Sequence, residues 1–206
     1  MATRSDPSRA DRRRAKTERS LTAAARELIA EDGVAALRIG AITERADVAV
    51  GSFYNYFDSK EGVVEAVVAE AIAGLAEALG RVMASLEDPA EAVSVSNRRF
   101  IRLAATDPEL ARLLVNLEDA DSRFETMVLP QARSALERGV AEGRFDVPDV
   151  GVALTSTVGA ALAVMRAILE GRLPPEADMP QAEGLLRSLG VEREQAREIA
   201  RRPLPS

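Results

Sequence analysis

The stretch VAVGSFYNYFDSKEG, from Val48 to Gly62, carries more information about this chain than any other. It holds both tyrosines of the sequence, two of its five phenylalanines and a lysine. It follows a short helical pattern and precedes a long one, which favours the second helix of a helix-turn-helix with a polar face on nucleic acid. A cluster of aromatic side chains packed just beneath the surface would show the same spacing, so spacing alone leaves both interpretations open.

The composition favours helices and argues against several kinds of chemistry. Ala, Leu, Val, Arg and Glu are abundant, whereas aromatic residues make up 3% of the 206 residues. The sequence has no cysteine and no histidine, and so lacks thiolates, the commonest general base and the commonest transition-metal ligand. The acidic residues Glu118, Asp119 and Asp121 lie between two predicted helices, where capping and solvation explain them. We expect no enzymatic activity, no metal site and no cofactor.

Charge is distributed unevenly along the chain. The net charge is −6, yet residues 1–60 hold 11 lysines and arginines against 9 aspartates and glutamates. Residues 1–11 lack periodicity and are predicted to be a disordered basic arm. The segment that follows, with Arg14 and Lys16, places basic charge where a footprint on phosphate would need it. A solubilising tail is the alternative.

Neither a secretory signal nor a membrane span is expected. The N-terminus has no apolar stretch behind its charges. The longest uncharged run, Val150 to Met165, is short for a membrane span and is better explained as a helix buried in protein. We expect a cytoplasmic protein without a membrane partner.

Hydrophobic periodicity predicts helices and no strands. Asp88-Pro89 and Asp107-Pro108 are typical of an N-cap followed by proline at the first helical position, and Ser59 is predicted to cap a long helix. Pro130 predicts a kink or a break. The expected helices are 17–32, 39–46, 50–57, 60–86, 89–106, 108–118, 122–142, 149–169, 180–189 and an exposed one at 191–202.

This pattern predicts an all-α protein of two domains. A three-helix helix-turn-helix DNA-binding domain is expected at 12–62, with its recognition motif at 38–57. A larger helical bundle for ligand binding and dimerisation is expected at 63–206.

The order of these elements and the residues of the opening stretch resemble the TetR family of bacterial transcriptional regulators. The resemblance runs from about Thr17 to Val68, and over 85–206 it is limited to the number and placement of helices. The matching residues are Ile42, Ala46, Val48, Gly51, Ser52, Tyr54, Tyr56, Phe57, Ser59, Lys60 and Glu61.

The resemblance implies that tyrosines and a lysine contact phosphates and that the face of Val50–Ser52 reads bases, whereas Phe53 and Phe57 belong to the core. Asp47, Arg38 and Ala49 depart from the family pattern at the two helix starts. The predicted DNA contacts are Arg14, Lys16, Arg38, Ala49, Val50, Gly51, Ser52, Tyr54, Asn55, Tyr56 and Lys60.

Inward-facing residues of the larger domain are expected to line an apolar cavity, with a filled core as the alternative. Thr155, Ser156 and Thr157 are either polar groups of that cavity or bonded to their own backbone. The predicted ligand-binding residues are Phe100, Leu103, Leu114, Leu117, Phe124, Met127, Val128, Thr155, Val158, Leu162 and Met165.

The helix at 150–169 carries small residues on one broad face and, with the 180–189 helix, predicts a homodimer interface. Together with the resemblance this implies a repressor that a small hydrophobic or amphipathic effector releases from a palindromic operator in double-stranded DNA. Two alternatives stay open. One is a helical small-molecule-binding protein or enzyme that has lost DNA binding, and the other is a ligand-independent dimeric DNA-binding protein.

Overall fold

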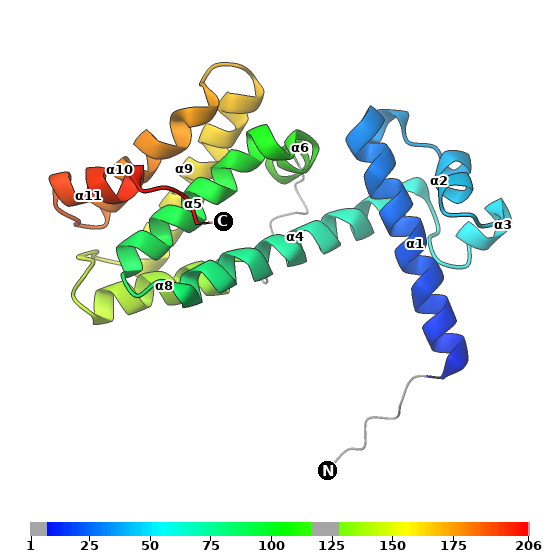
Figure 1. The fold of residues 1–206 in the computed structure, drawn as a ribbon, viewed down its shortest axis with the longest axis horizontal. Coiled ribbons are helices and arrows are strands. Elements are labelled where there is room, and N and C mark those ends of the chain that lie inside the picture. The colour runs from blue at the N-terminus through cyan, green and yellow to red at the C-terminus, as the bar shows by residue number, and fades with distance from the viewer. Residues whose placement is uncertain (1–7, 117–127, 206) are drawn as a thin grey trace, which may run out of the picture. The chain divides into compact units, whose positions relative to one another are not determined.

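The computed structural model describes residues 8–116 and 128–205, and in these ranges the chain forms helices and no strands (Figure 1). The chain divides into two compact units, Met1–Glu70 and Ala71–Ser206. The long helix α4, Lys60–Ser85, begins in the first unit and ends in the second. The predicted boundary after residue 62 differs from this division by a few residues.

The first unit contains α1 (Arg9–Asp32), a 3₁₀ turn (Val34–Ala36), α2 (Ile39–Arg45), α3 (Val50–Phe53) and the start of α4. These elements enclose a hydrophobic core. The completely buried or nearly buried members of that core are Leu21, Ala24, Ala25, Ile29, Leu37, Ile42, Phe53, Phe57, Val63 and Val67.

Helix α1 begins earlier than the sequence analysis predicted. Ser8 and Asp11 form a capping box, in which the Asp11 N–H donates to Ser8 Oγ at 3.1 Å and the Ser8 N–H donates to Asp11 Oδ2 at 3.0 Å. The side chain and the backbone N–H of Ser8 both lower the pKa of Asp11 by hydrogen bonding to its carboxylate. The prediction of a disordered arm is therefore wrong for residues 9–11, and residues 1–7 lie outside the described ranges.

Helix α3 is shorter than the predicted 50–57. The N–H of Asn55 donates to the Ser52 carbonyl and that of Tyr56 to the Phe53 carbonyl, and these i to i+3 bonds tighten the chain into a turn. The turn before α3 uses Asp47, whose φ of 54° lies in the left-handed region that Asp tolerates better than most side chains.

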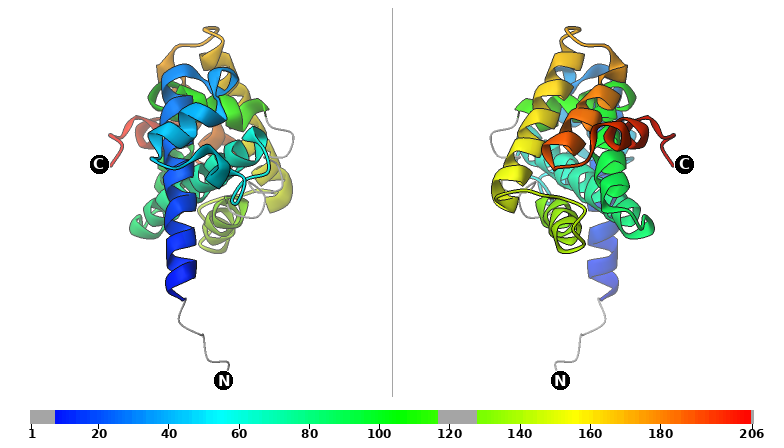
Figure 2. Two further views of the ribbon diagram at one scale, coloured as in Figure 1. Left: turned by 90° about the vertical axis from the view of Figure 1, so that its right-hand side faces the viewer. Right: turned by 90° about the vertical axis from the view of Figure 1, so that its left-hand side faces the viewer.

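The second unit is a helical bundle arranged around α5 (Pro89–Thr106). Helix α5 contacts α6 (Pro108–Asn116), α8 (Leu129–Ala141), α9 (Val150–Leu169), α10 (Asp178–Ser188) and α11 (Arg193–Arg201) (Figures 1 and 2). A second 3₁₀ turn, Pro175–Ala177, precedes α10.

The predicted helix caps of both units are confirmed. Asp88 accepts from the Ala90 N–H at 2.9 Å, and Asp107 accepts from the Leu110 N–H at 3.1 Å. Ser59, at the start of α4, accepts from the Gly62 N–H at 3.2 Å. Each side chain satisfies a backbone donor that the first helical turn leaves free.

Two helices differ from the prediction. Helix α8 begins at Leu129, with Pro130 in its first turn, so proline starts this helix; the earlier part of the predicted 122–142 helix lies outside the described ranges. Helix α11 was expected to be exposed, but Ala196, Ile199 and Ala200 are buried where it packs on α10 and α5. Its apolar residues lie on one face, which a single unpaired helix would leave in water.

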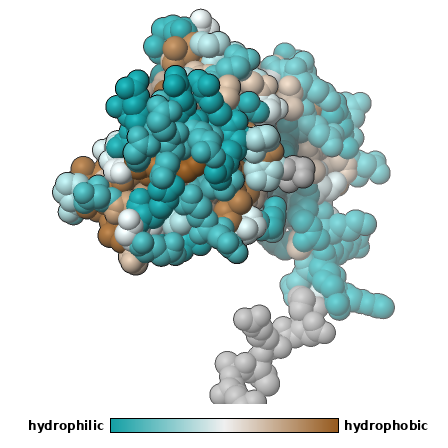
Figure 3. Space-filling view, turned by 60° about the vertical axis from the view of Figure 1, so that its left-hand side comes forward, coloured by the Kyte–Doolittle hydropathy of each residue, from teal (hydrophilic) through white to brown (hydrophobic). Residues whose placement is uncertain are grey.

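Helix α9 is the one described helix that is long and apolar enough to cross a membrane, and 22% of that stretch is buried in the chain. It packs on α5, α6, α8 and α10, as a bundle helix does. The sequence predicted a helix buried in protein, and this is correct for one side of α9 only, because Val152, Gly159 and Ala163 are exposed. On the face of the molecule in Figure 3, hydrophilic atoms predominate and hydrophobic atoms reach the surface in scattered patches.

Candidate DNA-binding surface and effector cavity

The aromatic cluster of the opening stretch is divided between the core and the surface. Phe53 is 0% exposed and Phe57 is 8% exposed, and their ring centroids lie 5.6 Å apart. Tyr54 is 56% exposed and meets Phe53 edge to face at 5.5 Å. Tyr56 is half-buried against the same core. The phenylalanines therefore hold the short helix in place, and the Tyr54 ring has one face on the protein and the rest in water.

Arg14 links α1 to the turn after α3. Its guanidinium donates to the Asn55 carbonyl at 3.1 Å and lies 5.5 Å from the centre of the Tyr56 ring. A guanidinium carries five N–H donors, so this contact leaves others for a phosphate. Arg14 thus has a role in orienting Tyr56 that the sequence analysis did not predict.

None of the predicted DNA contacts is buried. Ser52, Tyr56 and Lys60 are partly exposed and the other eight are exposed. Ala49 and Arg38 stand at the starts of α3 and α2 without a side-chain capping bond. At the start of α4, hydrogen bonds from its own backbone N–H and from Ser59 lower the pKa of Glu61.

A cavity of about 70 Å³ lies inside the second unit, between α4, α5, α8 and α9. Its wall is almost entirely apolar, with three polar side chains: Ser96 and Asn97 from α5 and Thr157 from α9. The apolar lining residues are Leu79, Met83, Val93, Phe100, Val128, Leu129, Ala132, Leu136, Leu154, Val158 and Ala161.

Two of the three polar groups have no hydrogen-bond partner in the described structure. Ser96 is 5% exposed and Asn97 is 8% exposed, yet Ser96 Oγ and Asn97 Oδ1 are unpaired. Thr157 instead donates its hydroxyl to the Ala153 carbonyl at 2.7 Å. A buried polar atom without a partner costs about 1–3 kcal/mol, so these two lining residues carry hydrogen-bonding capacity that the described part of the chain does not use.

The predicted ligand-binding residues are only partly brought together. Phe100, Val128 and Val158 line the cavity. The structure places Leu103, Leu114, Leu162 and Met165 elsewhere in the bundle, away from this cavity. Thr155 must be corrected, because it is exposed and donates to the Gly151 carbonyl of its own helix at 2.9 Å. Three further predicted ligand-binding residues lie outside the described ranges: Leu117, Phe124 and Met127. The acidic residues Glu118, Asp119 and Asp121 lie outside them as well.

The sequence analysis missed the walls supplied by α4 and α8 and the polar pair on α5. One signal was present, because Ser94, Ser96 and Asn97 stand together inside a helix that the Asp88-Pro89 cap defines. Polar residues at the centre of a bundle helix are uncommon unless they bind something.

A larger opening of about 570 Å³ adjoins the cavity between α4 and α8, and Met83 lines both. Gln131 packs directly against Gly80, where an added Cβ atom would stand 2.2 Å from Gln131 Oε1. Met83 therefore borders both spaces, whereas Gln131 lines the larger opening, and both side chains are flexible.

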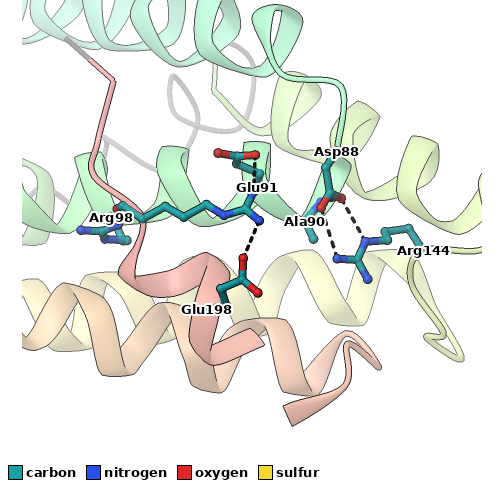
Figure 4. A network of polar contacts seen from close by, with 7 residues as sticks. Asp88, Ala90, Glu91, Arg98, Arg144 and Glu198 are labelled. Carbon is teal, nitrogen blue, oxygen red and sulfur yellow. Dashed lines mark hydrogen bonds and ion pairs between the residues drawn. The ribbon is translucent and has the colours of Figure 1, made fainter. Parts of the chain in front are cut away.

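The other end of α5 is held by ion pairs. Arg144 Nε donates to Asp88 Oδ1 at 3.0 Å, and Arg202 pairs with Glu91 at 2.8 Å and with Glu198 at 3.0 Å (Figure 4). Burial raises the pKa of Asp88, but the hydrogen bonds from Arg144 and from the Ala90 N–H outweigh it, and the pKa lies below its ordinary value. The described residues contain no group of three or more acidic side chains placed to hold a metal ion.

Two family models match the chain. Residues 21–67 match the model described as bacterial regulatory proteins of the tetR family, and residues 88–202 match the tetracyclin repressor-like C-terminal domain. The chain belongs to the TetR family of transcriptional regulators. This confirms the resemblance and the all-helical fold predicted from the sequence. TetR-family regulators are non-enzymatic transcription factors, so the expectation that the chain is not an enzyme is also confirmed.

Several solved structures resemble this one. RolR, in complex with resorcinol, is 35% identical, with a TM-score of 0.79 over 95% of this chain and 98% of that chain. A TetR/AcrR-family regulator from Thermobifida fusca is 26% identical, with a TM-score of 0.66 over 85% and 97%. FadR from Bacillus subtilis, in complex with stearoyl-CoA, is 20% identical, with a TM-score of 0.68 over 82% and 98%, and shows the shared fold alone. A comparison with curated proteins found no match.

Proposed function

We propose that this TetR-family regulator is a cytoplasmic homodimeric repressor that binds a palindromic operator and leaves it when a small effector enters the cavity of the bundle. The observation that carries the proposal is the division of the aromatic cluster. Phe53 and Phe57 fix the helix-turn-helix from within, while Val50 and Tyr54 are 53% and 56% exposed on the matched DNA-binding unit. An exposed tyrosine and the partly exposed Lys60 suit phosphate contacts, and small residues at α3 suit close approach to base edges.

The exposed face of α9 supports the homodimer. Val152 is 66% exposed, and Gly159, Ala160 and Ala163 are exposed along the same helix. Small residues at helical spacing permit two helices to approach closely, and a two-fold axis would bury this apolar face without a membrane. A symmetric dimer would also present two recognition helices to a palindrome.

The position of the cavity supports release by an effector. Leu79 and Met83, in the last turns of α4, line the cavity, and α4 runs unbroken from Lys60. A ligand that fits best when α4 has shifted would favour the shifted conformation, and a shift of α4 would alter the separation of the two recognition helices. The resorcinol bound by RolR, at 35% identity, supports a small effector for this chain as well.

DNA binding is tested with the purified full chain and a labelled duplex from the region upstream of its own gene, beside a scrambled duplex. Specific binding that weakens with rising salt is expected. The double variant Tyr54→Ala with Lys60→Ala should lose it, whereas Arg81→Ala, which removes an exposed cation from the bundle, should bind like the wild type. Equal binding of both duplexes, or unchanged binding by the double variant, would contradict the proposal.

A further inference from the structure

We infer that the effector is a small, uncharged ring compound that carries hydroxyl groups, a phenol or dihydroxybenzene, and that Ser96 and Asn97 bind those hydroxyls. This inference rests on the proposed effector cavity and specifies its chemistry. Three features support it: the size of the cavity, the lack of charged side chains among its described lining residues, and the unpaired polar atoms of Ser96 and Asn97.

Size limits the ligand to about one ring. The cavity measures about 70 Å³, whereas a dry cavity of about 150 Å³ admits benzene. A single ring can enter if Met83 moves, since an unbranched thioether side chain adopts other conformations readily. An extended acyl chain would exceed this cavity and would have to continue into the adjoining opening between α4 and α8.

Charge excludes an ionised ligand. Among the residues that the structure describes, none that lines the cavity is a lysine, arginine, aspartate or glutamate. Transfer of an unpaired carboxylate from water into such a wall costs far more than one hydrogen bond returns. Benzoate is therefore excluded even though its ring is no larger than that of phenol.

The unpaired atoms select a hydroxyl donor. Asn97 Oδ1 only accepts hydrogen bonds, so the ligand must donate to it. Ser96 Oγ can accept from a second hydroxyl or donate to it. The Thr157 hydroxyl, whose proton is directed to Ala153, keeps a lone pair for a ligand donor. A plain hydrocarbon would leave these atoms unsatisfied, whereas a phenol would pair them.

The first experiment measures binding of four probes to the full chain by titration calorimetry: resorcinol, phenol, toluene and benzoate. We expect resorcinol and phenol to bind, toluene to bind about tenfold more weakly than phenol, and benzoate not to bind. Toluene or benzoate binding as well as phenol overturns the inference.

The second experiment uses three variants of α5. Asn97→Leu should bring the affinities for phenol and toluene to within about threefold of each other, and Ser96→Ala should weaken resorcinol more than phenol. Ser94→Ala is the matched control, because Ser94 Oγ is also buried and unpaired but does not line the cavity, and it should leave all affinities unchanged. Equal effects of Ser94→Ala and Ser96→Ala would contradict the inference.

Stability separates a binding role from a structural one. Asn97→Leu and Ser96→Ala each remove an unpaired buried atom, so both should raise the melting temperature of the free protein while they lower affinity for hydroxylated rings. If the melting temperature and the affinity both fall, the two residues belong to the structural core and the inference is overturned.

If no probe binds but the protein still binds its upstream duplex, this inference fails and the proposed repressor remains. If the duplex is not bound, the proposed function fails regardless of the probes.

Discussion

The two units treat their buried polar groups in opposite ways. In the first unit, Thr22 and Thr43 are 2% and 1% exposed, and each hydroxyl donates to a carbonyl of its own helix at about 3.1 Å. In the second unit, Ser96 and Asn97 are also buried but leave Oγ and Oδ1 unpaired. A unit that must present one fixed surface to DNA gains from a satisfied core, whereas a unit that binds a ligand keeps groups for that ligand.

The second unit also contains a buried ion pair, and its arginine follows Asn97 directly in the sequence. Arg98 is 3% exposed and Asp178 is 0% exposed, and Arg98 Nε donates to Asp178 Oδ2 at 2.9 Å. Arg102 donates to the same oxygen at 3.1 Å, and the Arg202 carbonyl accepts from Arg98 at 2.6 Å. Helix α5 therefore pairs its buried charge well one residue away from the unpaired Oδ1 of Asn97.

The largest expected effect is that of Asp178→Ala. It leaves the Arg98 guanidinium buried without its carboxylate, which should lower the free energy of unfolding by about 3–5 kcal/mol. Both tyrosines lie in the first unit and the chain has no tryptophan, so tyrosine fluorescence reports that unit and far-ultraviolet circular dichroism reports the whole chain. The dichroism transition in urea should move more than the fluorescence transition. A loss below about 1 kcal/mol would show that the pair is not needed.

The next largest effect distinguishes the buried Phe53 from the exposed Tyr54 in the first unit. Phe53→Leu removes ring atoms from a completely buried site and should cost about 2 kcal/mol in the fluorescence transition. Tyr54→Leu, at the neighbouring exposed position, should change stability by less than about 0.5 kcal/mol and yet weaken binding to the upstream duplex. Equal stability losses would contradict the assignment of one ring to the core and the other to the surface.

The first unit could be predicted from the sequence in more detail than the second. In the stretch around Val48–Gly62 the structure is set by local signals: Asp47 for the turn, Ser59 for the cap, and aromatic residues at helical spacing. Even there, the end of α3 was missed, because i to i+3 bonds after Phe53 depend on how the turn packs. Arg14 was predicted to contact DNA, but its contact with Asn55 and Tyr56 joins residues about 40 positions apart.

The cavity could not be derived in the same way. Its wall comes from four helices, and periodicity shows which side of a helix is apolar but not where along the bundle two helices separate. Met165 and Val158 lie on one helix, yet Met165 is completely buried in the core and Val158 lines the cavity. Small differences in packing decide between these positions, and those are set by residues far away in the sequence.

Acid should act on the second unit through Asp88. The pKa of Asp88 is lower in the folded chain than in the unfolded chain, where it is near 3.9. The ionised Asp88 therefore stabilises the fold above the unfolded pKa, and this stabilisation is lost as pH falls through the folded pKa. Asp88→Asn keeps an N-cap for α5 but removes the charge that binds Arg144. Below about pH 4, acid unfolding followed by circular dichroism should be less steep for this variant than for the wild type. Parallel curves for the two proteins would indicate that another carboxylate dominates.

The smallest expected effect is the stability change on removing one buried hydroxyl from each unit, and its sign should differ between the two units. Thr43→Val keeps the shape of a buried side chain but deletes a hydroxyl that donates to the Ile39 and Gly40 carbonyls at 3.1 and 3.0 Å, and it should lower stability by about 0.5–1 kcal/mol in the fluorescence transition. Ser96→Ala deletes a hydroxyl that has no partner in the described structure, and should raise stability in the dichroism transition. Shifts of the same sign would mean that both units satisfy their buried hydroxyls alike, and the reason to assign Ser96 to a ligand would be gone.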